Sequence, residues 1–197
     1  MVGFLLALLL SGCGGGDDVQ TGDLHGTIVD PPFQVAADDL HDTDGNDYSL
    51  ADSTDKRLTL VFFGYTHCPD ICGTVMSNLA SAMTRLDERD REQVDVVFVT
   101  TDPERDTGPV LRRYLDRFDT SFVGVTDDPT EIGEIAEVAR SIAVGMGEEL
   151  PTGGYDVDAH TTQVTAIDVD DEAPMYWSQT TSSAQFAHDI HLLLGGS

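Results

Sequence analysis

The stretch Phe62-Phe63-Gly64-Tyr65-Thr66-His67-Cys68-Pro69-Asp70-Ile71-Cys72-Gly73-Thr74 places two cysteines four residues apart, directly after an apolar run. The run 58–63 is typical of a buried strand. If a helix begins in the loop, Cys68 and Cys72 share one helix face, about 6 Å apart along the axis. That separation lies near the upper limit for a disulfide, and it also lets two thiolates hold one soft metal ion. The stretch therefore predicts a strand, a cysteine loop and a helix that carry either a redox pair or a metal clamp.

Strand and helix patterns alternate along the rest of the chain. Buried strands are predicted for 58–63 and 94–100, and strands on either side of a turn at 169–172 are predicted for 162–168 and 173–177. Apolar residues at helical spacing predict helices over 72–91, 107–118, 129–139 and 183–194, with Asp128 as the cap of the third. This order predicts an α/β, thioredoxin-like fold, with a mixed central sheet flanked by helices and a β-hairpin near the C-terminus.

The chain is strongly acidic. It has 36 Asp and Glu against 10 Lys and Arg, a formal charge of -26, and a single lysine, Lys56. This charge disfavours nucleic acid and anionic membrane surfaces as partners. The acidic residues interrupt apolar runs and do not form one block, which favours a folded protein adapted to high salt over a disordered acidic chain. At ~3 Å Debye length near 1 M salt, the self-repulsion is mostly screened.

The first residues have the pattern of an export segment. The apolar run 4–10 is much shorter than the ~20 residues that span a bilayer, and Ser11-Gly12-Cys13 follows it. Leu10 to Cys13 resembles a lipoprotein signal box, which implies lipid on Cys13. We therefore expect a signal segment over 1–13, a flexible acidic tether over 14–30, a folded domain over 31–197, and anchoring to the outer face of the cell membrane. The alternative is an uncleaved hydrophobic end with Cys13 as an ordinary thiol.

Three sequence blocks, 63–72, 101–107 and 155–160, resemble in order and spacing the signature blocks of the Sco/SenC family. That family comprises thioredoxin-fold copper chaperones of cytochrome oxidase. The resemblance implies one copper ion, Cu(I) or Cu(II), held by Cys68, Cys72 and His160. The chain differs from the family pattern at Gly73, where proline is usual, and at Ala159, which separates Asp158 from His160.

The chemistry of these residues agrees with that ligand set. Two thiolates and one imidazole favour copper and can also hold zinc, whereas hard ions need several carboxylates. Cys68 would lie at a helix N-terminus, where unpaired N–H groups lower the pKa of a thiol. Asp70 between the cysteines is a candidate for tuning that pKa, and the resemblance adds Asp102 at the end of the next strand.

Simpler explanations stay open for several residues. Cys68 and Cys72 alone are compatible with a structural disulfide or with two unrelated buried thiols, and a lone histidine such as His160 is often only hydrogen-bonded. His67 is not expected to be a ligand, because its neighbouring position aims it away from a metal held by both cysteines. The segment 102–107 also reads as a turn with Asp106 as a helix cap. We assign no role to the remaining histidines, His25, His41, His188 and His191.

Two classes of function follow. The favoured one is a monomeric metallochaperone, anchored by lipid, that delivers copper to the binuclear copper site on a subunit of a terminal cytochrome c oxidase, or reduces the thiols of that site. The alternative is an enzyme, a thiol-disulfide oxidoreductase or peroxiredoxin-like protein in which Cys68 and Cys72 form the catalytic redox pair. The spacing favours the first class, because dedicated oxidoreductases of this fold usually have two residues between the cysteines and this chain has three.

Overall fold

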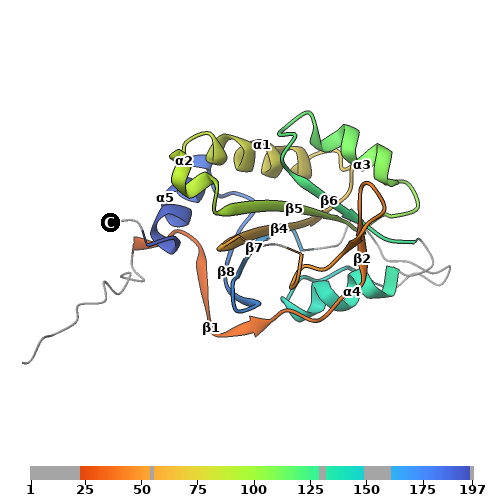
Figure 1. The fold of residues 1–197 in the computed structure, drawn as a ribbon, viewed down its shortest axis with the longest axis horizontal. Helices are drawn as coiled ribbons and strands as arrows, with labels where there is room; N and C mark the ends of the chain where they lie inside the picture. Colours follow the sequence, from red (N-terminus) through yellow and green to blue (C-terminus); the bar gives the residue numbers. More distant parts are fainter. Residues whose placement is uncertain (1–22, 54–55, 129–131, 149–160, 196–197) are drawn as a thin grey trace, which may run out of the picture.

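In the part of the chain that the structure describes, a mixed sheet of eight strands organises the fold (Figure 1), in the order β1-β8-β7-β4-β5-β6-β2-β3. The computed structural model describes residues 23–53, 56–128, 132–148 and 161–195, and no helix among them is long and apolar enough to cross a membrane. The strands are β1 Thr27–Gln34, β2 Leu40–Asp42, β3 Asp47–Tyr48, β4 Leu58–Gly64, β5 Val94–Thr100, β6 Val123–Thr126, β7 Val164–Asp168 and β8 Glu172–Trp177. The helices are α1 Ile71–Met83, α2 Glu88–Arg91, α3 Gly108–Leu115, α4 Ile132–Ser141 and α5 Ser183–Leu193.

The directions of the strands place two loops at one edge of the sheet. β4 pairs in parallel with β5, and β5 pairs in parallel with β6, whereas β7 runs antiparallel to β4. The residues Gly64 and Thr100 are partners at the ends of β4 and β5. The loops that follow these strands therefore leave the sheet side by side. The mixed sheet and the β7–β8 hairpin confirm the predicted thioredoxin-like fold.

The central strand β4 separates two cores. All of its residues are buried, and successive side chains point to opposite faces of the sheet. Leu60 and Phe62 pack with α1, α3 and α5, whereas Val61 and Phe63 pack with α4. Figure 1 shows α1, α2 and α3 on one side of the sheet and α4 on the other. Burial on both faces explains why this strand is a continuous apolar run in the sequence.

The helix predicted over 72–91 is in fact two helices. α1 ends at Met83, and Asp87 begins α2 as its N-cap, where its carboxylate accepts the backbone N–H of Asp90 at 2.9 Å. Arg91 then donates its Nε–H to the carbonyl oxygen of Met83, at 2.9 Å. The apolar spacing alone could not reveal this break, because Leu86 continues the buried face beyond the end of α1.

The sheet also begins earlier than predicted. β1 starts at Thr27, which is paired with Tyr176 of β8, so the last residues of the expected tether 14–30 belong to the fold. The short strands β2 and β3 were not predicted either. β2 has three residues and β3 has two, so they leave little periodicity to detect. The helix expected over 129–139 corresponds to α4, Ile132–Ser141. Residues 129–131, where that helix was expected to begin, lie outside the described residues, so the cap at Asp128 stays a prediction.

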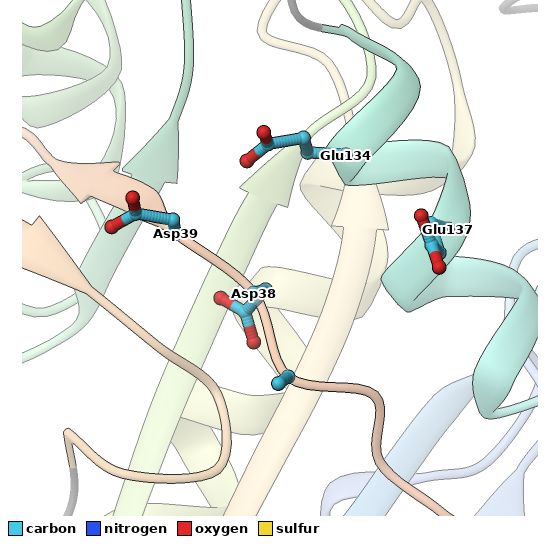
Figure 2. A pocket seen from close by; sticks show the side chains of 5 residues that line it. Asp38, Asp39, Glu134 and Glu137 are labelled. Carbon is cyan, nitrogen blue, oxygen red and sulfur yellow. The ribbon is translucent and has the colours of Figure 1, made fainter.

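A hollow lined by carboxylates lies beside α4. Figure 2 shows Asp38 and Asp39 on the segment before β2, and Glu134 and Glu137 on α4. Burial raises the pKa of Asp38 to about 6, and this effect outweighs the hydrogen bond from the backbone N–H of Leu50. Asp38 is therefore an acidic group that the folded state holds more readily in its neutral form.

We predict that Asp38→Asn stabilises the protein at neutral pH. Because the pKa of Asp38 is raised from 3.8 to about 6 on folding, the native state binds more protons in that window, and stability falls as pH rises through it. The amide carries no charge and still offers an oxygen to Leu50. The gain in melting temperature over wild type should therefore grow from about pH 4 to about pH 7. Asp39→Asn, at an exposed position, serves as the control, and a difference that does not change with pH would contradict the prediction.

Candidate metal centre

The cysteine loop leaves the sheet at the end of β4 and leads into α1. It is held against the end of β5, because Thr101 donates its backbone N–H to the carbonyl oxygen of Gly64 at 2.7 Å. Within the loop, Cys68 donates its backbone N–H to the carbonyl oxygen of Tyr65 at 3.2 Å. Ligand sites in open α/β sheets characteristically lie outside the carboxyl ends of parallel strands, which is where this loop lies.

A buried carboxylate, Asp106, ties the cysteine loop to the end of β5. It is fully buried, and it accepts hydrogen bonds from the backbone N–H of Thr66 at 2.8 Å, from the Thr66 hydroxyl at 2.5 Å and from the Thr100 hydroxyl at 2.8 Å. The prediction that Asp106 caps a helix was wrong, because Thr107 is the N-cap of α3. Asp106 instead fixes the position of the loop, a role that sequence analysis missed because Thr66 lies 40 residues away.

The two sulfurs lie together and differ in their surroundings. Both cysteines are free; Cys72 is fully buried, and Cys68 is half-buried. The backbone N–H of Cys72 donates to Cys68 Sγ at 3.4 Å, as expected for a sulfur at the N-terminus of α1. The predicted shared helix face is wrong, because α1 begins at Ile71 and Cys68 lies in the loop before its N-cap; the two cysteines instead meet through this hydrogen bond.

The pKa values of the two thiols shift in opposite directions. Burial raises the pKa of Cys68, but hydrogen bonds from the Cys72 thiol and from the backbone N–H groups of Asp70, Cys72 and Ile71 outweigh it, so the net pKa is lowered. For Cys72, burial raises the pKa, and donating its thiol proton to Cys68 raises it further. Cys68 is therefore the more readily ionised sulfur of the pair, and Cys72 holds its proton more firmly.

Gly64 provides the space for the buried sulfur. A Cβ atom at this position would lie 3.0 Å from Cys72 Sγ, 2.9 Å from the ring of Phe62 and 3.1 Å from the ring of Phe98. Tyr114 lies on the same side, with its ring centroid 5.6 Å from that of Phe98, and burial raises its pKa. The floor of the centre is therefore a close-packed aromatic layer with no room for a side chain on Gly64.

The other predicted residues near the loop make different contacts. Asp102 forms an ion pair with Arg105, and its backbone N–H donates to the Thr100 hydroxyl at 3.0 Å. Asp70 is the N-cap residue of α1, but its side chain makes no cap hydrogen bond. Its backbone N–H donates to the Cys68 sulfur and helps to lower the pKa of that thiol. His67 Nδ1 lies 3.0 Å from the Thr66 hydroxyl. Roles for Asp70 and Asp102 in tuning the thiols stay predictions.

Two predicted site residues lie outside the described ones. His160, the third expected ligand, falls in 149–160, and Cys13, the expected lipid attachment site, falls in 1–22. The described chain resumes at Thr161, whose backbone N–H donates to the carbonyl oxygen of Gly145 at 2.8 Å. The centre as described therefore consists of the sulfur pair and its supports.

A basic hollow of 490 Å³ opens beside the loop. Thr66 and His67 line it from the loop, and Arg113, Tyr114 and Arg117 line it from α3 and the residues that follow. The guanidinium of Arg117 lies over the Tyr114 ring, 4.7 Å from its centroid. Positive charge is scarce in this chain, so two arginines in a hollow that Thr66 and His67 of the cysteine loop also line distinguish this face.

Comparisons with known proteins agree on one family. A family model described as SCO1/SenC matches residues 27–195. The chain is 34% identical over 144 residues to the SCO2-like protein of Rickettsia felis, covering 72% of this chain and 68% of that protein. It is 34% identical over 114 residues to the protein SCO1 homolog 1, mitochondrial, of Arabidopsis thaliana, covering 53% of this chain and 34% of that protein. The chain thus spans about a third of the length of this last relative.

A solved structure agrees with the same family. The structure of Bradyrhizobium japonicum ScoI with copper bound matches with a TM-score of 0.66 at 29% identity, covering 81% of this chain and 99% of that one. The likeness therefore extends over most of both chains, and the protein in that structure holds copper.

We predict opposite effects for two glycine substitutions that lie near the cysteines. Gly64→Ala places its Cβ against Cys72 Sγ and two rings, and should destabilise the fold by about 1–3 kcal/mol through overpacking. Gly73→Ala, inside α1, meets nothing within 4 Å and should stabilise it by roughly 0.5–1 kcal/mol through helix propensity. Urea unfolding of both variants measures the two changes. Equal effects of the two substitutions would show that Gly64 is not needed for the packing of Cys72.

Proposed function

This chain belongs to the SCO1/SenC family, and from that premise we propose that it is a copper-binding assembly factor for a terminal cytochrome oxidase. Copper is its cargo, and the ligands are Cys68, Cys72 and His160. The acceptor is the binuclear copper site on an oxidase subunit. The activity is delivery of copper to that site, or reduction of the site's thiols by Cys68 and Cys72.

The observation that carries this proposal is the unequal pair of thiols. Soft copper prefers thiolate ligands, and the lowered pKa of Cys68 makes this half-buried sulfur the easier of the two to ionise. Cys72 lies four residues away and must release its proton when the metal binds. Its proton is held by Cys68, so the first metal–sulfur bond removes the acceptor that keeps Cys72 protonated. The two sulfurs fit a soft ion that is captured first by Cys68 and then by Cys72.

The course of the chain supports His160 as the third ligand. β7 begins at Val164, four residues after His160, and Val164 is paired with Phe62 near the end of β4. The described chain therefore returns, within a few residues of His160, to the edge of the sheet where the cysteine loop lies. The four residues from His160 to Val164 can span at most about 14 Å when extended, which keeps His160 near this edge.

The surroundings of the centre favour an acidic partner. Arg113 and Arg117 line the hollow beside Cys68, on a chain with a formal charge of -26. Opposite charges on a partner would orient it over the half-buried sulfur and speed the encounter. The chain works as a monomer in this proposal. It is held at the outer face of the cell membrane through lipid on Cys13.

Thiol-disulfide exchange is the second candidate function. A half-buried, more readily ionised sulfur with a buried partner thiol four residues away is also a suitable arrangement for a redox couple, with Cys68 as the attacking sulfur and Cys72 as the resolving one. The two functions differ in their need for His160, which ligates copper but has no part in the exchange.

We predict a one-to-one Cu(I) complex in a Cys13→Ser background, which removes the third thiol. Replacing Cys68 or Cys72 with serine removes one of three ligands, and a loss of about 3 kcal/mol would weaken affinity by at least roughly 100-fold. His160→Ala should weaken it as well, whereas His67→Ala, next to the same loop, should leave it unchanged. Competition with a chromophoric Cu(I) chelator measures the affinities.

The same variants separate the two functions. Unchanged affinity in His160→Ala would show that the three-ligand site is wrong. Rapid, copper-independent turnover of glutathione disulfide by the wild type, and equally by His160→Ala, would support the redox enzyme instead of the chaperone.

A further inference from the structure

Three side chains with metal-binding atoms meet where the chain enters β1 alongside α5. They are His25, His188 and Asp189, whose ligand atoms all lie within 4.8 Å of one another. Among the residues that the structure describes, this is the one group of at least three His, Cys, Asp or Glu residues with such spacing. None of the three belongs to the cysteine loop or to the residues that support it.

Asp189 is the fixed part of the cluster. Its side chain is completely buried, and Oδ2 accepts the backbone N–H groups of His25 and Gly26, both at 2.9 Å, and the indole N–H of Trp177 at 2.7 Å. Three N–H donors converge on this one oxygen, which acts only as an acceptor. The carboxylate therefore holds the start of β1, the end of β8 and α5 in one arrangement.

The same carboxylate orients the ring of His25. Asp189 Oδ1 lies 2.9 Å from His25 Nδ1. With the carboxylate oxygen as the acceptor, Nδ1 is the donor, and in the neutral ring Nε2 then keeps its lone pair. A carboxylate that holds one nitrogen of an imidazole in this way is the usual support of a metal-ligating histidine, since it fixes the tautomer and makes the other nitrogen more basic.

His188 has a matching arrangement. Its Nε2 lies 3.1 Å from the carbonyl oxygen of Asp23, an acceptor only, so in the neutral ring Nε2 carries the proton and Nδ1 keeps a lone pair. The rings of His25 and His188 meet edge to face with centroids 5.2 Å apart. Two imidazoles bound to one tetrahedral zinc ion, each with its nitrogen 2.0–2.1 Å from the metal, hold their centroids about 5 Å apart. Both residues are exposed, so an ion can enter and water can complete its coordination.

We propose that His25 and His188 bind a divalent zinc-type ion through Nε2 and Nδ1, with Asp189 as the positioning carboxylate. Imidazole nitrogen suits Zn²⁺, Cu²⁺ and Ni²⁺ and does not suit Mg²⁺ or Ca²⁺. The strongly negative chain also raises the local concentration of cations. The bound ion joins the segment before β1 to α5 and so stabilises the N-terminal edge of the fold. This site is independent of the proposed copper centre, because its ligands are nitrogen and lie on other elements.

The test uses Zn²⁺ alone and a full-length background without the proposed copper ligands, in which Cys13, Cys68 and Cys72 are changed to serine and His160 to alanine. Calorimetric titration in high salt, which suppresses diffuse binding to carboxylates, should show one equivalent of Zn²⁺. His25→Ala and His188→Ala, added singly, should each abolish that equivalent. Each should also abolish the rise in melting temperature that Zn²⁺ produces in the background protein.

His41→Ala is the matched control. The side chain of His41 is 41% exposed against 40% for His25, and it too lies beside a buried carboxylate, that of Asp127. Zn²⁺ binding should be unchanged in this variant. Retention of the equivalent in His25→Ala or His188→Ala, or its equal loss in His41→Ala, would overturn the proposal. So would full binding at about pH 5, where histidine ligands are protonated and carboxylates are not.

Discussion

The buried carboxylate of Asp106 is the interaction on which the cysteine loop depends. β4 and β5 end side by side, and Asp106 joins the loops beyond them by accepting hydrogen bonds from Thr66 and Thr100. Each bond to a charged group contributes ~1.5–3 kcal/mol, and together they offset the cost of burying the charge. The loop therefore has one position relative to the sheet, and Cys68 reaches the N-terminus of α1 from that position.

The unequal character of the two sulfurs follows from this placement. Cys68 lies at the open side of the centre and receives backbone N–H groups, whereas Cys72 lies beneath it on a floor of aromatic rings that only Gly64 leaves space for. Cys68 ionises more easily than an ordinary thiol, whereas burial and the hydrogen bond to Cys68 hold the proton on Cys72. Metal capture and thiol-disulfide exchange begin from the same state of this pair. The two functions differ in the third ligand, because the proposed copper site needs His160 and thiol-disulfide exchange does not.

The sequence was informative where the cause of a structure is local. The buried strand before the cysteines, a helix after them and the hairpin near the C-terminus were predicted correctly, because strand burial, helical periodicity and turns depend on neighbouring residues. Contacts between distant residues were not predictable in this way. The role of Asp106 depends on Thr66, and the His25–Asp189 pair joins residues 164 apart. Sequence periodicity does not reveal such pairs. Asp106 was therefore wrongly predicted as a helix cap, and His25 was assigned no role.

Thiol reactivity tests the central claim, that Cys68 and Cys72 form an unequal pair built to capture a soft metal. Alkylation of the reduced, metal-free protein with iodoacetamide, followed across pH by peptide mass spectrometry, measures each sulfur separately. The account predicts that Cys68 reacts with an apparent pKa below the ordinary value of 9.0, that Cys72 stays unmodified in the folded protein, and that one equivalent of Cu(I) protects Cys68. Equal reactivity of the two cysteines, or reaction of Cys68 undiminished by Cu(I), would contradict it.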